Sequence, residues 1–189
     1  MPIFRSRHQA DLLTWLLLHS DREYTVTELA KRLDVPLTTL HREAQRLVDA
    51  DLIRGRTVGR SRLLRANPAH RAAASLTRLL EVTFGPHTVI EDEFDNVPDV
   101  ASVLIYGSWA ARYHGARGAP PADLDVLVVG SPERADVYDA ADRAQDRLGM
   151  QVNPLIRTPQ QWVEATDPLI RQIQSSPTVI VIDTGMDAA

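Results

Sequence analysis

Three short apolar runs in the second half of the chain constrain its fold most strongly. They cover residues 103–106, 124–129 and 179–182, and each has the length of a β-strand rather than of a helix. Helical stretches separate them, of which residues 137–148 have the clearest helical pattern. Strands that alternate with helices predict an α/β sheet packed by helices, in which the strand order can be mixed.

Length and charge indicate two modules. The chain has 189 residues, more than the roughly 100 to 150 of a typical single domain. Residues 1–66 carry 12 basic and 8 acidic side chains, whereas residues 67–189 carry 9 and 17. The first part is therefore basic, although the net charge of the chain is −4. A basic surface attracts phosphate, so nucleic-acid contacts are expected in the first part.

Composition excludes several classes of protein. The 44% hydrophobic and 24% charged residues are typical of a globular chain. The longest apolar stretch, residues 12–18, is far shorter than the roughly 20 residues of a membrane-spanning helix. No secretory signal is legible at the start, so we expect a cytoplasmic protein without a membrane partner. The lack of cysteine excludes thiolate metal sites, and the six histidines show no zinc-motif spacing.

Three short helices are expected before residue 50. Leucines at helical spacing predict the first over about 7–19. Thr25 and Glu28 form a capping-box pattern that begins the second, and Pro36 ends it because proline disfavours helical geometry in the preceding residue. The third begins near Leu37. Its apolar face is Leu40, Ala44, Leu47 and Val48, and its polar, cationic face is Thr38, Thr39, His41, Arg42, Gln45 and Arg46.

An arginine-rich hairpin is expected after the third helix. Residues 52–56 and 62–66 are predicted as two strands, and Gly59 permits the turn between them. Residues 52–66 contain five arginines and no acid. Arg56, Arg60 and Arg62 fit contacts to duplex phosphates or to a minor groove, whereas the simpler interpretation of a charged run is a solvated surface.

Order and spacing give the first part a resemblance to a known family. The run VTELAKRLDVPLTTLHREAQRLVDADLIRGRTVGRSRLLRAN, within residues 8–66, resembles the winged helix-turn-helix domains of bacterial repressors of the arsenic-responsive and multiple-antibiotic-resistance types. The resemblance implies that the third helix enters the major groove of double-stranded DNA. A homodimer is expected because palindromic operators are read by dimers, with the apolar first helix around Leu16 as the dimer surface. The alternative is a helical bundle that binds another protein.

Two features of the second half carry chemistry. Gly107 and Ser108 directly follow the first apolar run and precede a short helix, so their N–H groups and hydroxyl can hold phosphate oxygens. Asp123 and Asp125 open the next run, and strand alternation points both carboxylates to one face with Leu124 on the other. Two like charges that close favour a cation such as Mg²⁺ between them. Each feature alone is more often an ordinary turn or a solvated strand end.

Together these features give the second half a resemblance of its own. The run LIYGSWAARYHGARGAPPADLDVLVVG, residues 104–130, resembles the signature of the DNA polymerase β nucleotidyltransferase superfamily. The resemblance implies a nucleotidyltransferase fold that binds a nucleoside triphosphate with Mg²⁺. Gly107 and Ser108 would bind the triphosphate, and Asp123 and Asp125 would hold the metal and carry catalysis. Arg112 resembles an arginine of the small members, which neutralises phosphate charge.

One carboxylate of that signature is missing. Active members supply a third acid from a later strand, but the next predicted strand, residues 150–157, offers Asn153. An amide cannot accept a proton as a general base at pH 7. Asp183 can substitute only if the fold brings it near. His114, at the end of the short helix, either caps that helix or reaches a bound nucleotide.

These features predict an α+β or α/β protein of three parts: a winged helix-turn-helix domain at 1–66, a connecting helix at 67–83, and a nucleotidyltransferase-like domain with a mixed sheet packed by helices at 84–189. The expected function is DNA binding, with a second domain that binds Mg²⁺ and NTP and transfers a nucleoside monophosphate to an unidentified hydroxyl. The alternative is a transcriptional repressor whose second domain is catalytically inactive and acts as a nucleotide sensor or partner surface. A third hypothesis, implied by the resemblance, is an antitoxin-like protein that modifies a partner.

Overall fold

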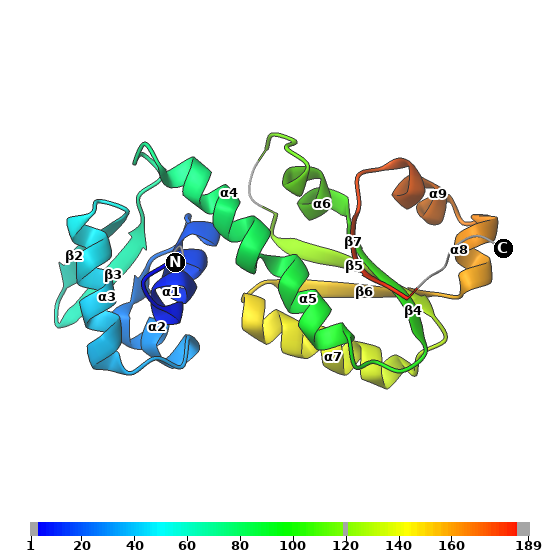
Figure 1. The fold of residues 1–189 in the computed structure, drawn as a ribbon, viewed down its shortest axis with the longest axis horizontal. Helices are drawn as coiled ribbons and strands as arrows, with labels where there is room; N and C mark the ends of the chain where they lie inside the picture. Colours follow the sequence, from blue (N-terminus) through cyan, green and yellow to red (C-terminus); the bar gives the residue numbers. More distant parts are fainter. Residues whose placement is uncertain (1–3, 119–120, 185–189) are drawn as a thin grey trace. The chain divides into compact units, whose positions relative to one another are not determined.

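Three clusters of buried apolar side chains organise the described residues, one in the first half of the chain and two on opposite faces of a sheet in the second. A computed structural model describes residues 4–118 and 121–184 (Figure 1). The chain divides into two units, Met1–Gly85 and Pro86–Ala189. Every helix that the described residues form is too short or too polar to cross a membrane.

The first unit combines helices with a small antiparallel sheet of order β1-β3-β2. Its elements along the chain are α1 (Arg7–Leu18), β1 (Tyr24–Thr25), α2 (Val26–Arg32), α3 (Leu37–Asp49), β2 (Ile53–Val58), β3 (Ser61–Ala66) and α4 (Ala73–Phe84). This is the element order of a helix-turn-helix followed by a wing. The helix expected to connect the two parts, over residues 67–83, is observed as α4 and packs on α1 within the first unit.

Local sequence signals account for the boundaries of these elements. The predicted capping box is confirmed, since the Glu28 N–H donates to the Thr25 hydroxyl at 3.1 Å and the Thr25 N–H donates to the Glu28 carboxylate at 2.7 Å. The strands of the hairpin are longer than predicted, because they pair up to Val58 and Ser61. Only Gly59 and Arg60 are left for the turn, and Gly59 has the positive φ of 59° that such a tight turn requires.

The first helix is not an open apolar surface, which corrects the expectation that it forms the dimer contact. Leu12 and Leu16 are fully buried, and Trp15 is 7% exposed. These side chains pack in one cluster with residues of α2, α3, both hairpin strands and α4. The apolar stripe is wide because several neighbours within the unit cover it, so α1 offers no apolar face to a second chain.

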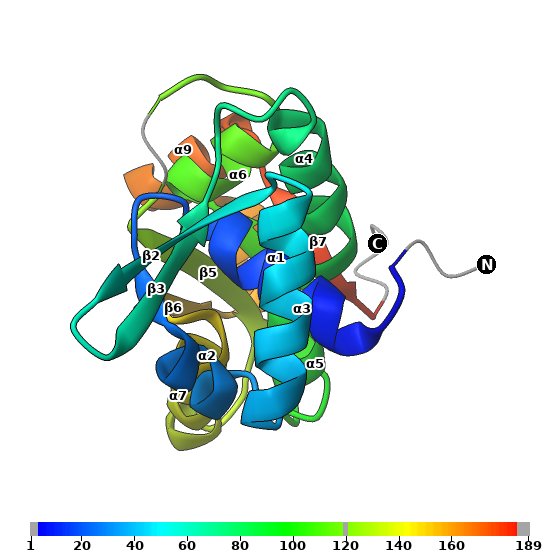
Figure 2. The same cartoon turned by 90° about the vertical axis from the view of Figure 1, so that its left-hand side faces the viewer.

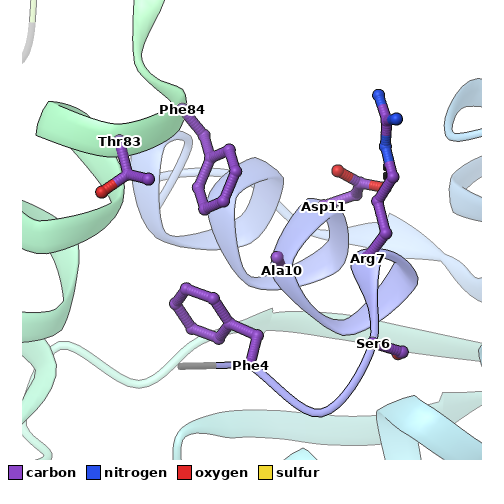
Figure 3. Close-up of a pocket in the computed structure, with 7 residues that line it drawn as sticks. All are labelled: Phe4, Ser6, Arg7, Ala10, Asp11, Thr83 and Phe84. Atoms are coloured by element: carbon purple, nitrogen blue, oxygen red, sulfur yellow. Dashed lines mark ion pairs between the residues drawn. The ribbon is translucent and has the colours of Figure 1, made fainter. Parts of the chain in front are cut away.

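A pocket of about 520 Å³ remains between the start of α1 and the end of α4 (Figure 3). The rings of Phe4 and Phe84, whose centroids are 6.0 Å apart, lie on one side of it, and the Arg7–Asp11 ion pair lies on the other. Burial raises the pKa of the Asp11 carboxyl, against the opposing charges of Arg7 and His8. The pocket is lined by Phe4, Ser6, Arg7, Ala10, Asp11, Thr83 and Phe84.

The second unit is built on a mixed sheet of order β6-β5-β4-β7, in which β5 and β6 are parallel and the other pairs antiparallel. Its elements are α5 (Pro86–Phe94), β4 (Val100–Tyr106), α6 (Gly107–Tyr113), β5 (Asp123–Gly130), α7 (Arg134–Leu148), β6 (Gln151–Arg157), α8 (Pro159–Glu164), α9 (Pro168–Ser175) and β7 (Val179–Asp183). The expected mixed sheet packed by helices is confirmed.

Helices cover both faces of this sheet (Figure 1). On one face, Leu124, Val126 and Val128 of β5 pack with residues of α5 and α7. On the other face, Leu127 and Val129 pack with residues of α8 and α9. The central strand β5 is therefore buried from both sides. Its two charged residues, Asp123 and Asp125, lie at its N-terminal end.

The buried α1 leads to a stability prediction. Leu16→Ala leaves a cavity in the core of the first unit, and the neighbouring side chains can close it only in part. We expect this variant to lower the free energy of unfolding of the first unit by about 2 to 5 kcal/mol. Leu79→Ala on α4 is the control, because Leu79 is 37% exposed, and it should cost about 1 kcal/mol or less. Urea unfolding followed by tryptophan fluorescence measures both. Equal losses would contradict the assignment of α1 to the core.

Candidate nucleic-acid interface and nucleotide site

The third helix of the first unit presents a polar face, as its spacing predicts. Thr38, His41, Arg42 and Gln45 are exposed, whereas Thr39 and Arg46 are half-buried. Leu40, Ala44 and Leu47 are buried on the opposite side. The exposed side chains of α3 that are expected to face DNA therefore lie in its first two turns, with Gln45 just beyond them.

Sequence reasoning missed one residue of this helix. Glu43 is 3% exposed, and its Oε1 accepts a hydrogen bond of 2.7 Å from Arg46 Nη1. The Nε of Arg42 lies 3.9 Å from the same oxygen. The signal was present in the spacing, because position 43 lies three residues after Leu40 and four before Leu47, which places it on the apolar side of the helix.

The wing arginines differ in how they are held. Arg56 forms a bidentate ion pair with Glu23. Its Nε donates to Glu23 Oε1 at 3.0 Å and to Oε2 at 3.1 Å, and its Nη2 also donates to Oε2. This hydrogen bond lowers the pKa of the Glu23 carboxyl. Arg62 Nη2 donates to Gln45 Oε1 at 2.8 Å and so ties the wing to α3. Arg60 is exposed and lies in the turn between β2 and β3. The β2–β3 hairpin extends away from α1, α2 and α3 (Figure 2).

In the second unit, strand pairing brings the polar residues of three strands together. Asp125 stands opposite Tyr106 on β4 and opposite Asn153 on β6. The Asn153 amide donates to Asp123 Oδ2 at 3.1 Å and to Asp125 Oδ1 at 3.3 Å. Both carboxylates lie on the face opposite Leu124, as alternation predicts. Asn153 thus lies directly at the pair of aspartates.

Gly107 brings the start of α6 to the same place. A Cβ at this position would lie 2.6 Å from Asp125 Oδ2, and the residue has a φ of 74°. Only glycine allows the backbone to pass so close to the carboxylate. Ser108 is exposed beside it, and no side chain caps the helix start. The predicted phosphate-binding turn and the predicted metal ligands are therefore adjacent.

The charges of the cluster are closely coupled. Burial raises the pKa of the Asp125 carboxyl; the hydrogen bond from Asn153 opposes that rise, and the nearby charge of Asp123 adds to it. Burial, together with the Asp125 charge, raises the pKa of the Tyr106 hydroxyl, which the charge of Arg157 offsets in part. A cation at the two aspartates would relieve this repulsion.

The donor set suits a magnesium ion that is shared with phosphates. Among the residues that the structure describes, no three His, Cys, Asp or Glu side chains come together as a metal site. Mg²⁺ does not need such a cage, since it is usually held by one or two carboxylates and by substrate phosphates. Asp123 and Asp125 would supply the two carboxylates, and the start of α6 at Gly107 lies directly beside Asp125.

Three further candidate residues are engaged elsewhere. Arg112 donates to the backbone oxygens of Ala116, at 2.8 Å, and of Gly118, so its guanidinium holds the loop after α6. His114 Nε2 lies 2.9 Å from the Thr178 oxygen, just before β7. Asp183 pairs with Ser102, four residues along β4 from Tyr106, which corresponds to about 13 Å of strand. Asp183 therefore does not replace the missing third carboxylate.

Comparison with known proteins supports the assignment of the first unit. Residues 15–56 match the IclR helix-turn-helix domain. This segment covers α2, α3 and part of the wing, so the chain carries a DNA-binding helix-turn-helix, which indicates a transcriptional regulator. No curated protein is significantly similar to the chain.

Two solved structures are distantly similar. Reduced HlyU from Vibrio cholerae N16961 is 20% identical, over 42% of this chain and 78% of that chain, with a TM-score of 0.36. A toxin-antitoxin structure with AMP-PNP is 15% identical, over 53% of this chain and 76% of that chain, with a TM-score of 0.38. At these scores neither similarity bears on the function of the chain.

The close approach of Gly107 to Asp125 leads to a prediction about coupling. Gly107→Ala adds a methyl group that displaces the Asp125 carboxylate, so we expect a loss of stability that is partly relieved when Asp125 is also alanine. The interaction energy of this double-mutant cycle should be about 0.5 to 3 kcal/mol. Gly115→Ala is the control, since Gly115 also has a positive φ but has no atom within 4 Å of the added methyl. Chemical unfolding measures all variants, and a cycle that is additive at Gly107 would contradict the contact.

Proposed function

We propose that this chain is a transcriptional regulator that binds double-stranded DNA through its first unit and senses a nucleoside triphosphate, bound with Mg²⁺, in its second. The observation that carries the second half of the proposal is the position of Asn153. Its amide donates to both aspartates, at the place where the nucleotidyltransferase signature has its third acid.

The chemistry of the cluster supports binding more than transfer. Mg²⁺ would be held by Asp123 and Asp125 and would neutralise the triphosphate. The N–H groups at Gly107 and Ser108 would donate to phosphate oxygens. Removing a proton from an attacking hydroxyl needs a base, and the amide of Asn153 offers none. The site then retains its ligands for the nucleotide but lacks the group that starts the reaction.

Transfer of a nucleoside monophosphate is the second candidate function. The adjacency of Gly107 and Asp125 favours it, because the same arrangement would place the triphosphate beside the metal. In that case the acceptor hydroxyl would need another base. The two candidates agree on nucleotide binding and differ only in whether pyrophosphate is released.

DNA binding through α3 and the wing predicts a strong dependence on salt. Arg60→Ala with Arg62→Ala should weaken binding to every duplex and reduce the slope of log K against log[salt] by about 2, since each lost phosphate contact removes roughly one unit. Arg42→Ala should mainly relax sequence preference. Arg7→Ala on α1, whose side chain is 92% exposed, is the matched control. Fluorescence anisotropy between 50 and 300 mM salt measures these effects, and salt-insensitive binding would rule out the interface.

Nucleotide binding depends on both aspartates under the proposal. Asp123→Asn or Asp125→Asn should weaken Mg²⁺-dependent NTP binding by more than about tenfold, because a metal bound through two carboxylates loses one charged ligand. Asp183→Asn is the control, because it makes the same charge change on β7, opposite Ser102 and away from the aspartate pair. It should not change NTP binding. Isothermal titration with each NTP, with and without Mg²⁺, provides the measurement. If no NTP binds at millimolar concentration, the proposed sensor function is wrong.

The exchange Asn153→Asp separates sensing from transfer. Incubation with Mg²⁺ and labelled NTPs, scored for self-labelling and pyrophosphate release, should show no turnover by the unaltered protein. The variant regains the third carboxylate and should gain turnover, since it supplies a base or ligand. Turnover by the unaltered protein that Asn153→Asp leaves unchanged would favour the transfer function over the sensor.

A further inference from the structure

Glu43 lies buried in the helix that is expected to read DNA. Among the residues that the structure describes, it is the charged residue with the least exposure, at 3%. One of its oxygens accepts from Arg46 at 2.7 Å, and the other, Oε2, is buried without a hydrogen-bond partner. A carboxylate in such surroundings needs a countercharge, because water no longer stabilises it. Arg46 supplies that charge.

Burial decides how firmly each arginine is held. If Arg46 left Glu43 for a DNA phosphate, the buried carboxylate would lose its hydrogen-bonded cation and keep only the more distant Arg42, at 3.9 Å. Losing a hydrogen bond to a buried charge costs more than about tenfold in the equilibrium constant. The pair of Arg56 with Glu23 is different, because their side chains are 59% and 27% exposed. A surface ion pair of that kind changes the equilibrium constant for folding by less than about tenfold. Arg56 can therefore exchange Glu23 for a phosphate at little cost.

We infer that Glu43 is a positioning residue, which retains Arg46 when DNA binds and leaves Arg42 as the arginine that α3 presents to the duplex. This removes Arg46 from the set of side chains expected to contact DNA. Arg42 is 63% exposed, and its Nε forms only a long ion pair of 3.9 Å with the same carboxylate oxygen, so Arg42 can turn to the duplex more easily than Arg46 can. The inference rests on the proposed DNA binding of the first unit.

The retained arginine affects the affinity for every duplex. Binding to any sequence depends on the number of phosphates that are neutralised, whereas discrimination depends on contacts to base edges. A carboxylate that neutralises one arginine of the reading helix lowers binding to all sequences without removing a base contact. Specific and non-specific binding are therefore weakened by a similar factor, and the ratio between them is left to base contacts such as those expected of Arg42.

The test compares salt slopes on a random-sequence 30-base-pair duplex. Glu43→Gln releases Arg46, so the slope of log K against log[salt] should steepen by about 1 and affinity should rise roughly threefold to tenfold. The double variant Glu43→Gln with Arg46→Gln has the same net charge as the unaltered protein and should keep its slope. Arg42→Gln, at a position expected to contact base edges, should leave the slope on this random duplex close to that of the unaltered protein. Anisotropy titrations of the full chain between 50 and 300 mM KCl give all four values.

Controls separate the positioning role from a loss of fold. Asp34→Asn removes one negative charge just before α3, at a residue whose positive φ of 50° asparagine tolerates, and should change the slope by much less than Glu43→Gln. Thermal melting shows whether each variant is folded, and Glu43→Met replaces Glu43→Gln if that variant unfolds. A double variant with a slope shallower by about 1 would show that Arg46 contacts phosphate and overturn the inference. If the unaltered chain binds no duplex, the proposed DNA binding itself fails.

Discussion

The register of β5 is the constraint on which the second unit depends. Its residues Leu124, Val126 and Val128 pack on one face of the sheet, and Leu127 and Val129 on the other. A shift of one residue would turn Asp123 and Asp125 into the core beneath α5 and α7 and would bury two unpaired charges. The packing of the strand thus fixes where the carboxylates emerge. The apolar residues position the site without forming part of it.

Close approach of the backbone completes that arrangement. Because Tyr106 pairs with Asp125, the chain enters α6 directly beside the carboxylate. The approach is possible since Gly107 has no Cβ, which would otherwise stand 2.6 Å from Asp125 Oδ2. The glycine is therefore needed for contact between two segments as well as for its positive φ. Its place in the sequence, between a buried strand and a helix, is what made the turn recognisable.

The parts of the structure that follow from local patterns were predictable, and those that need strand order or several neighbours were not. The capping box at Thr25, the break at Pro36 and the alternation around Leu124 are properties of a few consecutive residues. The contact of Asn153 with both aspartates depends on β6 lying beside β5, which no local pattern specifies, so Asn153 is expected at this site only through the family resemblance. The covering of Leu16 depends on α3, β3 and α4 together. The spacing of its helix shows that one side is apolar, but it does not show what packs there.

Glu43 illustrates the same limit within a single helix. Its spacing places it with the buried residues, whereas its charge suggests the surface, and composition alone does not decide between them. The structure resolves the conflict with an ion pair to Arg46 at 2.7 Å. Local inconsistency of this kind is expected at functional sites, where a residue is retained at some cost to stability. A buried charge in a reading helix is therefore a reason to look for a role in recognition.

Asn153 resolves a comparable conflict in the second unit. Two carboxylates on one face repel each other, and the pKa of Asp125 is raised by burial and by the charge of Asp123. The amide of Asn153 donates to both and so holds them together without a cation. An acid at this position would add a third negative charge, and the fold around it would then depend on bound metal. The amide cannot act as the base that transfer would need, but its two hydrogen bonds hold the aspartates in their arrangement. The proposed sensor function would require such an arrangement, because a sensor has to be stable with and without its ligand.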